Sequence, residues 1–198
     1  MKIIGKNSVS TLISYFFAFI FTVVLLFGIY EIIGWSISYY NLKTGSSVLK
    51  NLFITGTDVG WSKNQWISKM DSLQKFKFYF PFTEVNFRTG VFSLSTFIGN
   101  TFGNLFMIIF TYLSFRIFRE FSKQNFFNQN TIQLLKSFSW VCISFFVISI
   151  LLDVFLVNHF GAYSYSGFWF LMLGILLLFV VEFFKKGYEL QSENDLTI

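Results

Sequence analysis

The residues of this 198-residue chain that could do chemistry are few, and they form no recognisable catalytic arrangement. There is one histidine, His159, and one cysteine, Cys142. Catalysis needs a nucleophile with a base, a pair of carboxylates or a set of metal ligands. The sequence contains no HExxH, no Gly-rich phosphate loop and no CxxC motif. We therefore expect no enzymatic activity, no cofactor and no metal site.

Four polar residues stand in otherwise apolar stretches. Glu31 and Asp153 lie near the ends of two such stretches, and Asn100 and Asn104 are one helical turn apart in a third. Because polar groups in lipid must find partners, we expect these four residues to form an intramembrane polar network. Three interpretations of Asp153 stay open: structural pairing with Asn100, Arg88 or a loop tyrosine, handling of ions or protons, and simple exposure at the interface.

The composition indicates that these residues belong to an integral membrane protein. Hydrophobic residues make up 54% of the chain, charged residues 13%, and the mean hydropathy is +0.60. A soluble domain carries about 25% charged residues. A helix needs ~20 apolar residues to cross ~30 Å of hydrocarbon. Four segments meet this requirement and are predicted to be transmembrane helices: about 11–33, 95–117, 138–157 and 167–184.

The distribution of lysine and arginine predicts the orientation in the membrane. Eight of the fifteen positive residues lie in the short flanks on one side; these are Lys2, Lys6, Arg116, Arg119, Lys123, Lys136, Lys185 and Lys186. The other seven lie in the long loop 34–94, and long loops cross the membrane largely regardless of their charge. The short loop 158–166 on the other side has no lysine or arginine. The positive-inside rule therefore places both termini in the cytoplasm.

The long loop 34–94 is predicted to form a small mixed α/β lobe on the extracytoplasmic side. The fold class is thus mainly α, a four-transmembrane-helix bundle with this lobe inserted between helices 1 and 2. The loop opens with Trp35, Tyr39 and Tyr40, which suit an aromatic belt at the membrane interface. Residues 62–73 fit a short helix, and the alternation of residues 76–82 predicts a strand that enters a hairpin around 81–84. Whether the lobe is a packing lid or senses a ligand stays open.

On the cytoplasmic side, residues 119–137 are predicted to form a helical hairpin. Asn128 or Asn130 is a suitable N-cap for the helix that leads into the third span. Gly187 is predicted to end the fourth helix as its C′ residue. Residues 185–198 would then be a polar cytoplasmic tail.

Two segments carry a family resemblance. The ending Leu190–Ile198, LQSENDLTI, and the segment Phe127–Lys136, FNQNTIQLLK, resemble a bacterial membrane-protein family catalogued as domain of unknown function 2975. The four-span layout agrees, whereas the loop 34–94 is longer than in compact members. The resemblance implies a protein of the bacterial inner membrane without a known activity. Genes of this family often lie beside one for a small helix-turn-helix regulator of Cro/C1 type, which implies a cytoplasmic partner.

The preferred interpretation is a non-enzymatic regulatory or sensory partner of a transcription factor. Docking of that partner is expected on cytoplasmic residues, the candidates being Phe127, Lys136, Glu193, Asn194, Asp195 and Leu196. One alternative is a small transporter, which would have to be a homo-oligomer and would use Asn100, Asn104 and Asp153 to line a cavity. Another is an immunity-like protein against an envelope-active peptide. No basic cluster indicates direct binding of nucleic acid.

Overall fold

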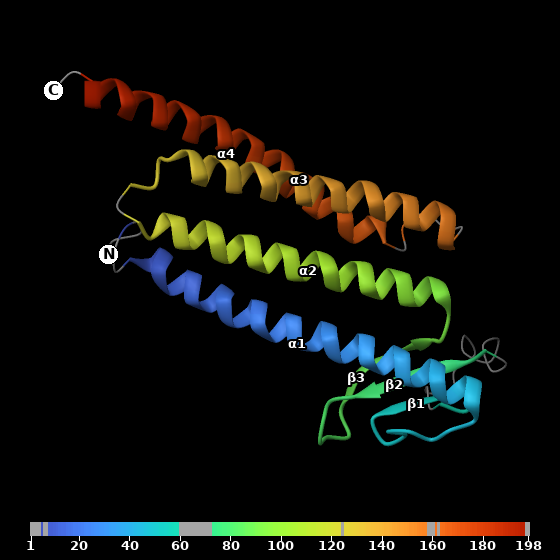
Figure 1. Ribbon diagram of the computed structural model, residues 1–198. Coiled ribbons are helices and arrows are strands. Elements are labelled where there is room, and N and C mark those ends of the chain that lie inside the picture. The colour runs from blue at the N-terminus through green and yellow to red at the C-terminus, as the bar shows by residue number, and fades with distance from the viewer. Residues whose placement is uncertain are drawn as a thin grey trace. The chain divides into compact units, whose positions relative to one another are not determined.

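The fold is mostly helical, with four long helices and a small sheet (Figure 1). The computed structural model describes residues 5, 8–59, 73–123, 125–157, 161 and 163–196. The helices are α1 (Val9–Thr44), α2 (Leu94–Phe121), α3 (Gln129–Leu152) and α4 (Ser164–Leu196). They cover the four predicted segments, apart from the end of the third, where a π-helical turn, η2 (Asp153–Val157), continues α3. Each helix is long and apolar enough to cross a membrane. Packing divides the chain into a bundle unit (Met1–Leu25 with Asn104–Ile198) and a lobe unit (Leu26–Gly103).

The bundle unit has an apolar core shared by α2, α3 and α4. Its buried members are Ile117, Leu135, Phe138, Cys142 and Val181. The first half of α1 packs on α2, where the rings of Phe17 and Phe118 stack with centroids 5.5 Å apart. At the start of α3 the side chain of Asn128 accepts a hydrogen bond of 2.9 Å from the backbone N–H of Thr131. The predicted N-cap at Asn128 is therefore confirmed.

Helices α3 and α4 meet along a seam of small residues. A Cβ atom on Gly174 would lie 2.9 Å from the carbonyl oxygen of Ser139 and 3.2 Å from Cβ of Cys142. A Cβ atom on Gly167 would lie 3.3 Å from Oγ of Ser149. Small residues allow helix backbones to approach closely where lipid supplies no hydrophobic driving force between helices. The two glycines, seven residues apart on α4, are the reason for this close packing.

The prediction that Gly187 ends the fourth helix is wrong. Helix α4 continues through it to Leu196, so the predicted tail 185–198 is largely helical. A glycine at position 187 allows the ring of Phe127 to pack against α4, since an added Cβ atom would lie 2.7 Å from that ring. Phe127 and Phe184 are also in ring contact, at 5.2 Å between centroids.

The lobe unit contains an antiparallel sheet in the order β1 (Phe53–Gly56), β2 (Lys75–Tyr79) and β3 (Asn86–Val91). The predicted strand is confirmed as β2, with Phe76 and Phe78 fully buried on one face. The predicted hairpin is the β2–β3 connection, whereas β1 was not predicted. The predicted helix over 62–73 lies, apart from its last residue, outside the described residues.

The second half of α1 supplies the other side of the lobe core. Helix α1 continues past the predicted end of its span to Thr44, where Gly45 follows with a φ of 68°, a conformation typical of the residue after a helix. Trp35 is 5% exposed and packs on Phe76 and Phe92. The prediction that Trp35 belongs to an interfacial aromatic belt is therefore wrong, because the sheet covers it.

Candidate functional site

The first candidate residue, Asp153, joins the end of α3 to the start of α4. It is fully buried and begins a π-helical turn, η2 (Asp153–Val157). Its carboxylate accepts hydrogen bonds from the backbone N–H groups of Gly161 (3.0 Å), Tyr163 (2.8 Å) and Ser164 (2.9 Å). The Ser164 hydroxyl is also hydrogen-bonded to this carboxylate. Burial, and then the negative charge of Asp153, raise the pKa of the Tyr163 hydroxyl above its ordinary value.

These contacts give Asp153 the function of a helix cap. The first N–H groups of a helix have no intrahelical partner, and a negative charge near them is favourable. The partners are backbone groups of the loop and of α4 rather than the side chains suggested by the sequence. Simple exposure at an interface is excluded by complete burial. A carboxylate that already holds several donors is poorly suited to pass an ion or a proton.

The second carboxylate, Glu31, pairs with an arginine of the sheet. Its Oε1 atom lies 2.7 Å from a guanidinium nitrogen of Arg88 and 3.4 Å from the indole nitrogen of Trp35. Glu31 is 2% exposed and Arg88 33%. Arg88, which the sequence offered as one of several possible partners of Asp153, pairs with Glu31. A buried charge needs such a partner, so this pair connects β3 to α1.

The two asparagines lie in different units of the structure. Asn100 is half-buried in the lobe unit with Glu31, and Asn104 is half-buried in the bundle unit with Asp153. Glu31 and Asp153 each belong to a local cluster of hydrogen bonds. A network common to all four residues stays a prediction.

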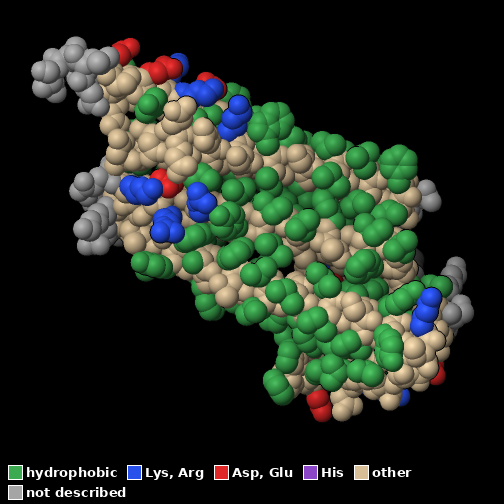
Figure 2. Space-filling view, viewed as in Figure 1, with side chains coloured by type: hydrophobic (Ala, Val, Ile, Leu, Met, Phe, Trp, Pro, Cys, Tyr) green, Lys and Arg blue, Asp and Glu red, His purple; other side chains and the backbone are tan. Residues whose placement is uncertain are grey.

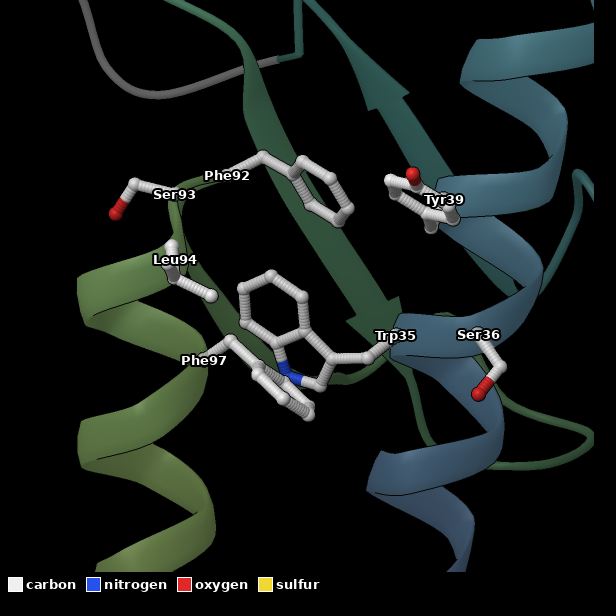
Figure 3. A pocket seen from close by; sticks show the side chains of 7 residues that line it. All are labelled: Trp35, Ser36, Tyr39, Phe92, Ser93, Leu94 and Phe97. Carbon is white, nitrogen blue, oxygen red and sulfur yellow. The ribbon is translucent and has the colours of Figure 1, made fainter.

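The lobe unit has an apolar pocket of about 410 Å³, lined by Trp35, Ser36, Tyr39, Phe92, Ser93, Leu94 and Phe97. In Figure 3, Leu94 and Phe97 point toward the Trp35 ring, whereas Ser36 points away. The Ser93 hydroxyl is hydrogen-bonded to the backbone N–H of Thr96 at the start of α2. The pocket walls are therefore mainly hydrocarbon, which suits an apolar group.

One end of the bundle unit is basic. Figure 2 shows Lys and Arg side chains gathered where α2 ends, α3 begins and α4 approaches its C-terminus; among the described residues these are Arg116, Arg119, Lys123, Lys136, Lys185 and Lys186. The ring contacts of Phe121 and Phe127 with Phe184 bring these helix ends together. Described residues of the α3–α4 connection at the opposite end include no lysine or arginine.

The predicted docking residues lie at this basic end, but they differ in accessibility. Lys136 and Glu193 are exposed, whereas Phe127 is half-buried against Gly187. Asn194, Asp195 and Leu196 belong to the last turns of α4, and their side chains lie outside the described part. Sequence reasoning missed Gly167 and Gly174 and gave Gly187 a different role, although small residues repeated along one helix are a detectable signal for close helix packing.

No group of three histidine, cysteine, aspartate or glutamate side chains that could hold a metal ion occurs within the described ranges. In comparisons with known proteins, a family model described as a protein of unknown function (DUF2975) matches residues 92–198. This match begins just before α2 and includes α3 and α4. Neither a curated protein nor a solved structure matches the chain.

Proposed function

This chain belongs to the DUF2975 family of proteins of unknown function, and on that premise we propose that it is a membrane-anchored regulatory component. It spans the bacterial inner membrane with α1 to α4 and recruits a cytoplasmic helix-turn-helix regulator. The observation that carries this proposal is the basic end of the bundle unit, together with the part of α4 that continues beyond it. We call that part the α4 extension (Tyr188–Leu196).

The basic end supports a cytoplasmic location of the α4 extension. Lysine and arginine in short connections and at helix ends are enriched on the cytoplasmic side of membrane proteins. Helix α4 has 33 residues, about 50 Å at 1.5 Å per residue, whereas ~20 residues cross the hydrocarbon. Lys185 and Lys186 mark the place where the helix leaves the membrane, so the α4 extension projects into the cytoplasm.

The surface of the α4 extension supports recognition of a protein. Tyr188 is 41% exposed and Leu190 is 62% exposed, and Glu189 and Glu193 are exposed beside them. Exposed apolar side chains need no explanation in lipid, but beyond the lysines they face water. A helix that carries apolar and charged side chains together is suited to docking on another protein.

The test is a co-purification of the regulator encoded beside this gene with the affinity-tagged chain from detergent-solubilised membranes. A double variant, Tyr188→Ala with Leu190→Ala, removes the two exposed apolar side chains of the α4 extension. We expect it to lose most of the captured regulator while it stays in the membrane fraction. The matched control, Leu176→Ala with Phe179→Ala, removes two side chains of α4 that are 62% and 64% exposed and should capture the regulator normally. Equal capture by both variants would refute docking on the α4 extension.

A further inference from the structure

The turn between β2 and β3 is unusual for a water-exposed loop. We call residues Phe80–Val85 the hairpin tip. The side chain of Phe82 is fully exposed and that of Val85 is 61% exposed. Phe82 also has a φ of 62°, a left-handed conformation that is unfavourable for a residue with a bulky side chain. Such strain is typical of segments with a functional role.

The contacts of the hairpin place this tip at a definite level along α1. The ring of Phe27 lies 5.5 Å from that of Phe80, and the Tyr30 hydroxyl donates a hydrogen bond to the carbonyl oxygen of Tyr79. The other end of the hairpin lies at Trp35, which stacks on Phe92. Phe27 and Trp35 are separated by about 12 Å along the helix. The hairpin therefore runs along α1, with its tip toward the N-terminal side of that helix (Figure 1).

At the level of the hairpin tip, α1 has an exposed apolar surface that suits contact with lipid. Its apolar side chains there are widely exposed; they are Leu26 (62%), Ile29 (49%), Ile32 (50%) and Ile33 (46%). The stretch lies within the segment predicted to span the membrane, 11–33. Its one charged residue, Glu31, is buried against Arg88, as a low-dielectric environment requires. A hairpin packed against this stretch shares its depth.

We propose that the hairpin tip is inserted in the outer leaflet of the membrane, where Phe82 and Val85 contact lipid acyl chains. This inference rests on the membrane-spanning arrangement proposed above. The ligand is the lipid surface, because Phe82 and Val85 are exposed apolar side chains of a hairpin that packs on α1 at the level of that helix's exposed apolar side chains. The lobe is then partly embedded, rather than held clear of the membrane.

The backbone of the tip is suited to this environment. In lipid, polar backbone groups must be satisfied within the protein. The N–H of Phe80 donates to the carbonyl of Val85, and the N–H of Thr83 donates to the carbonyl of Phe80. The N–H of Val85 donates to the hydroxyl of Thr83. The turn thus satisfies much of its own hydrogen bonding without water.

The charged residues beside the hairpin tip limit how deeply the tip can enter the membrane. Phe82 and Glu84 line a groove of about 900 Å³ that also contains Lys50 and Lys77. Lysine side chains keep their charged ends in water at the membrane surface, and exposed Glu84 also requires water. Aromatic side chains favour this same boundary between headgroups and acyl chains. The tip therefore lies near the boundary between headgroups and acyl chains of the outer leaflet and does not reach the bilayer centre.

The test uses a nitroxide spin label on a single introduced cysteine, in protein reconstituted into phospholipid vesicles. The native Cys142 is fully buried, so labelling is confined to the new position. Oxygen concentrates in hydrocarbon and a nickel chelate stays in water, so the ratio of their collision rates with the label reports depth. We expect the label at Phe82→Cys to favour oxygen, and a label at Asp58→Cys, at the opposite end of the sheet, to favour the nickel chelate.

A third label, at Trp140→Cys, separates the two proposals. Trp140 lies on α3 and is 52% exposed, so its label should favour oxygen if the bundle spans the membrane. A label that favours nickel at Phe82→Cys but oxygen at Trp140→Cys would overturn the hairpin insertion alone. Nickel preference at both positions would overturn the membrane-spanning arrangement as well. Protection of the Phe82→Cys label from both reagents would indicate a protein partner, such as a second copy, and would also overturn lipid contact.

Discussion

At the scale of single residues, two carboxylates in the apolar helices have structural roles. Glu31 balances the charge of Arg88 between α1 and β3, and Asp153 collects backbone N–H groups at the start of α4. An acidic residue in a membrane-spanning helix usually suggests transport. Here the partners of Asp153 account for its burial, and they make the polar-cavity interpretation of this residue unnecessary.

The first prediction concerns the cap formed by Asp153. Asp153→Ala leaves the N–H groups of Gly161, Tyr163 and Ser164 without their acceptor, and each buried unsatisfied group costs ~1–3 kcal/mol. We expect the free energy of unfolding in detergent micelles to fall by about 3 kcal/mol or more. Asp153→Asn keeps one acceptor oxygen, so its free energy of unfolding should fall by less. If Asp153→Ala unfolds like the control Asp58→Ala, which alters an exposed residue, the capping role is wrong.

At the scale of elements, the packing of α4 depends on where glycine replaces a larger side chain. Gly174 allows the backbone of α3 to come close, and Gly187 accommodates the ring of Phe127. Gly103 in α2 has open space around the position of a Cβ atom, with no atom within 4 Å. Gly174, which close packing requires, can therefore be compared with Gly103, which it does not require.

The second prediction uses this comparison. In Gly174→Ala the new methyl group would lie 2.8 Å from a side-chain carbon of Ile143 and 2.9 Å from the carbonyl oxygen of Ser139. Overpacking of this kind costs typically 1–3 kcal/mol, and a carbonyl on the rigid helix backbone cannot move aside easily. We expect Gly174→Ala to lower the thermal midpoint in micelles. Gly103→Ala, which also replaces a helical glycine, should not lower it. If both variants lowered the thermal midpoint equally, close packing of α3 on Gly174 would not be the reason for the effect.

Much of this element-level structure follows from the sequence, and the exceptions have physical causes. Hydrophobic length predicted the four helices, the alternation of Phe76 and Phe78 predicted β2, and Asn128 had the chemistry of an N-cap. Gly187 was misinterpreted because a glycine after an apolar run and two lysines looks like a helix end, whereas its reason is the distant ring of Phe127. Trp35 was misplaced because a tryptophan suits both a membrane interface and an aromatic core.

The candidate sites were less predictable than the fold. Sequence identified Glu31 and Asp153 as groups in need of partners, but a partner such as Arg88, 57 residues away along the chain, depends on how the sheet docks. The backbone N–H groups that surround Asp153 carry no residue-specific signal at all. The hairpin around residues 81–84 was predicted, but the level of its tip along α1 could not be, because that level is set by the contacts of Phe27 and Tyr30.

At the scale of the whole molecule, the asymmetry of charge makes a prediction about topology. The described lysines and arginines of the bundle unit lie at one end, and from the positive-inside rule we predict that this end is cytoplasmic. The same rule predicts that the loop 34–94, which follows the first span, is extracytoplasmic. The predicted cytoplasmic location of the basic end is what the proposed docking of a regulator on the α4 extension requires.

The third prediction tests this topology with a membrane-impermeant thiol reagent on intact spheroplasts. The reagent should label Asp58→Cys in the lobe unit directly, and it should label Glu189→Cys on the α4 extension only after the membrane is permeabilised. Wild-type protein provides the control, because buried Cys142 should stay unlabelled in both conditions. Labelling of Glu189→Cys in intact spheroplasts would place the α4 extension outside the cell. A cytoplasmic regulator could then not dock there, even if the hairpin tip were found in lipid.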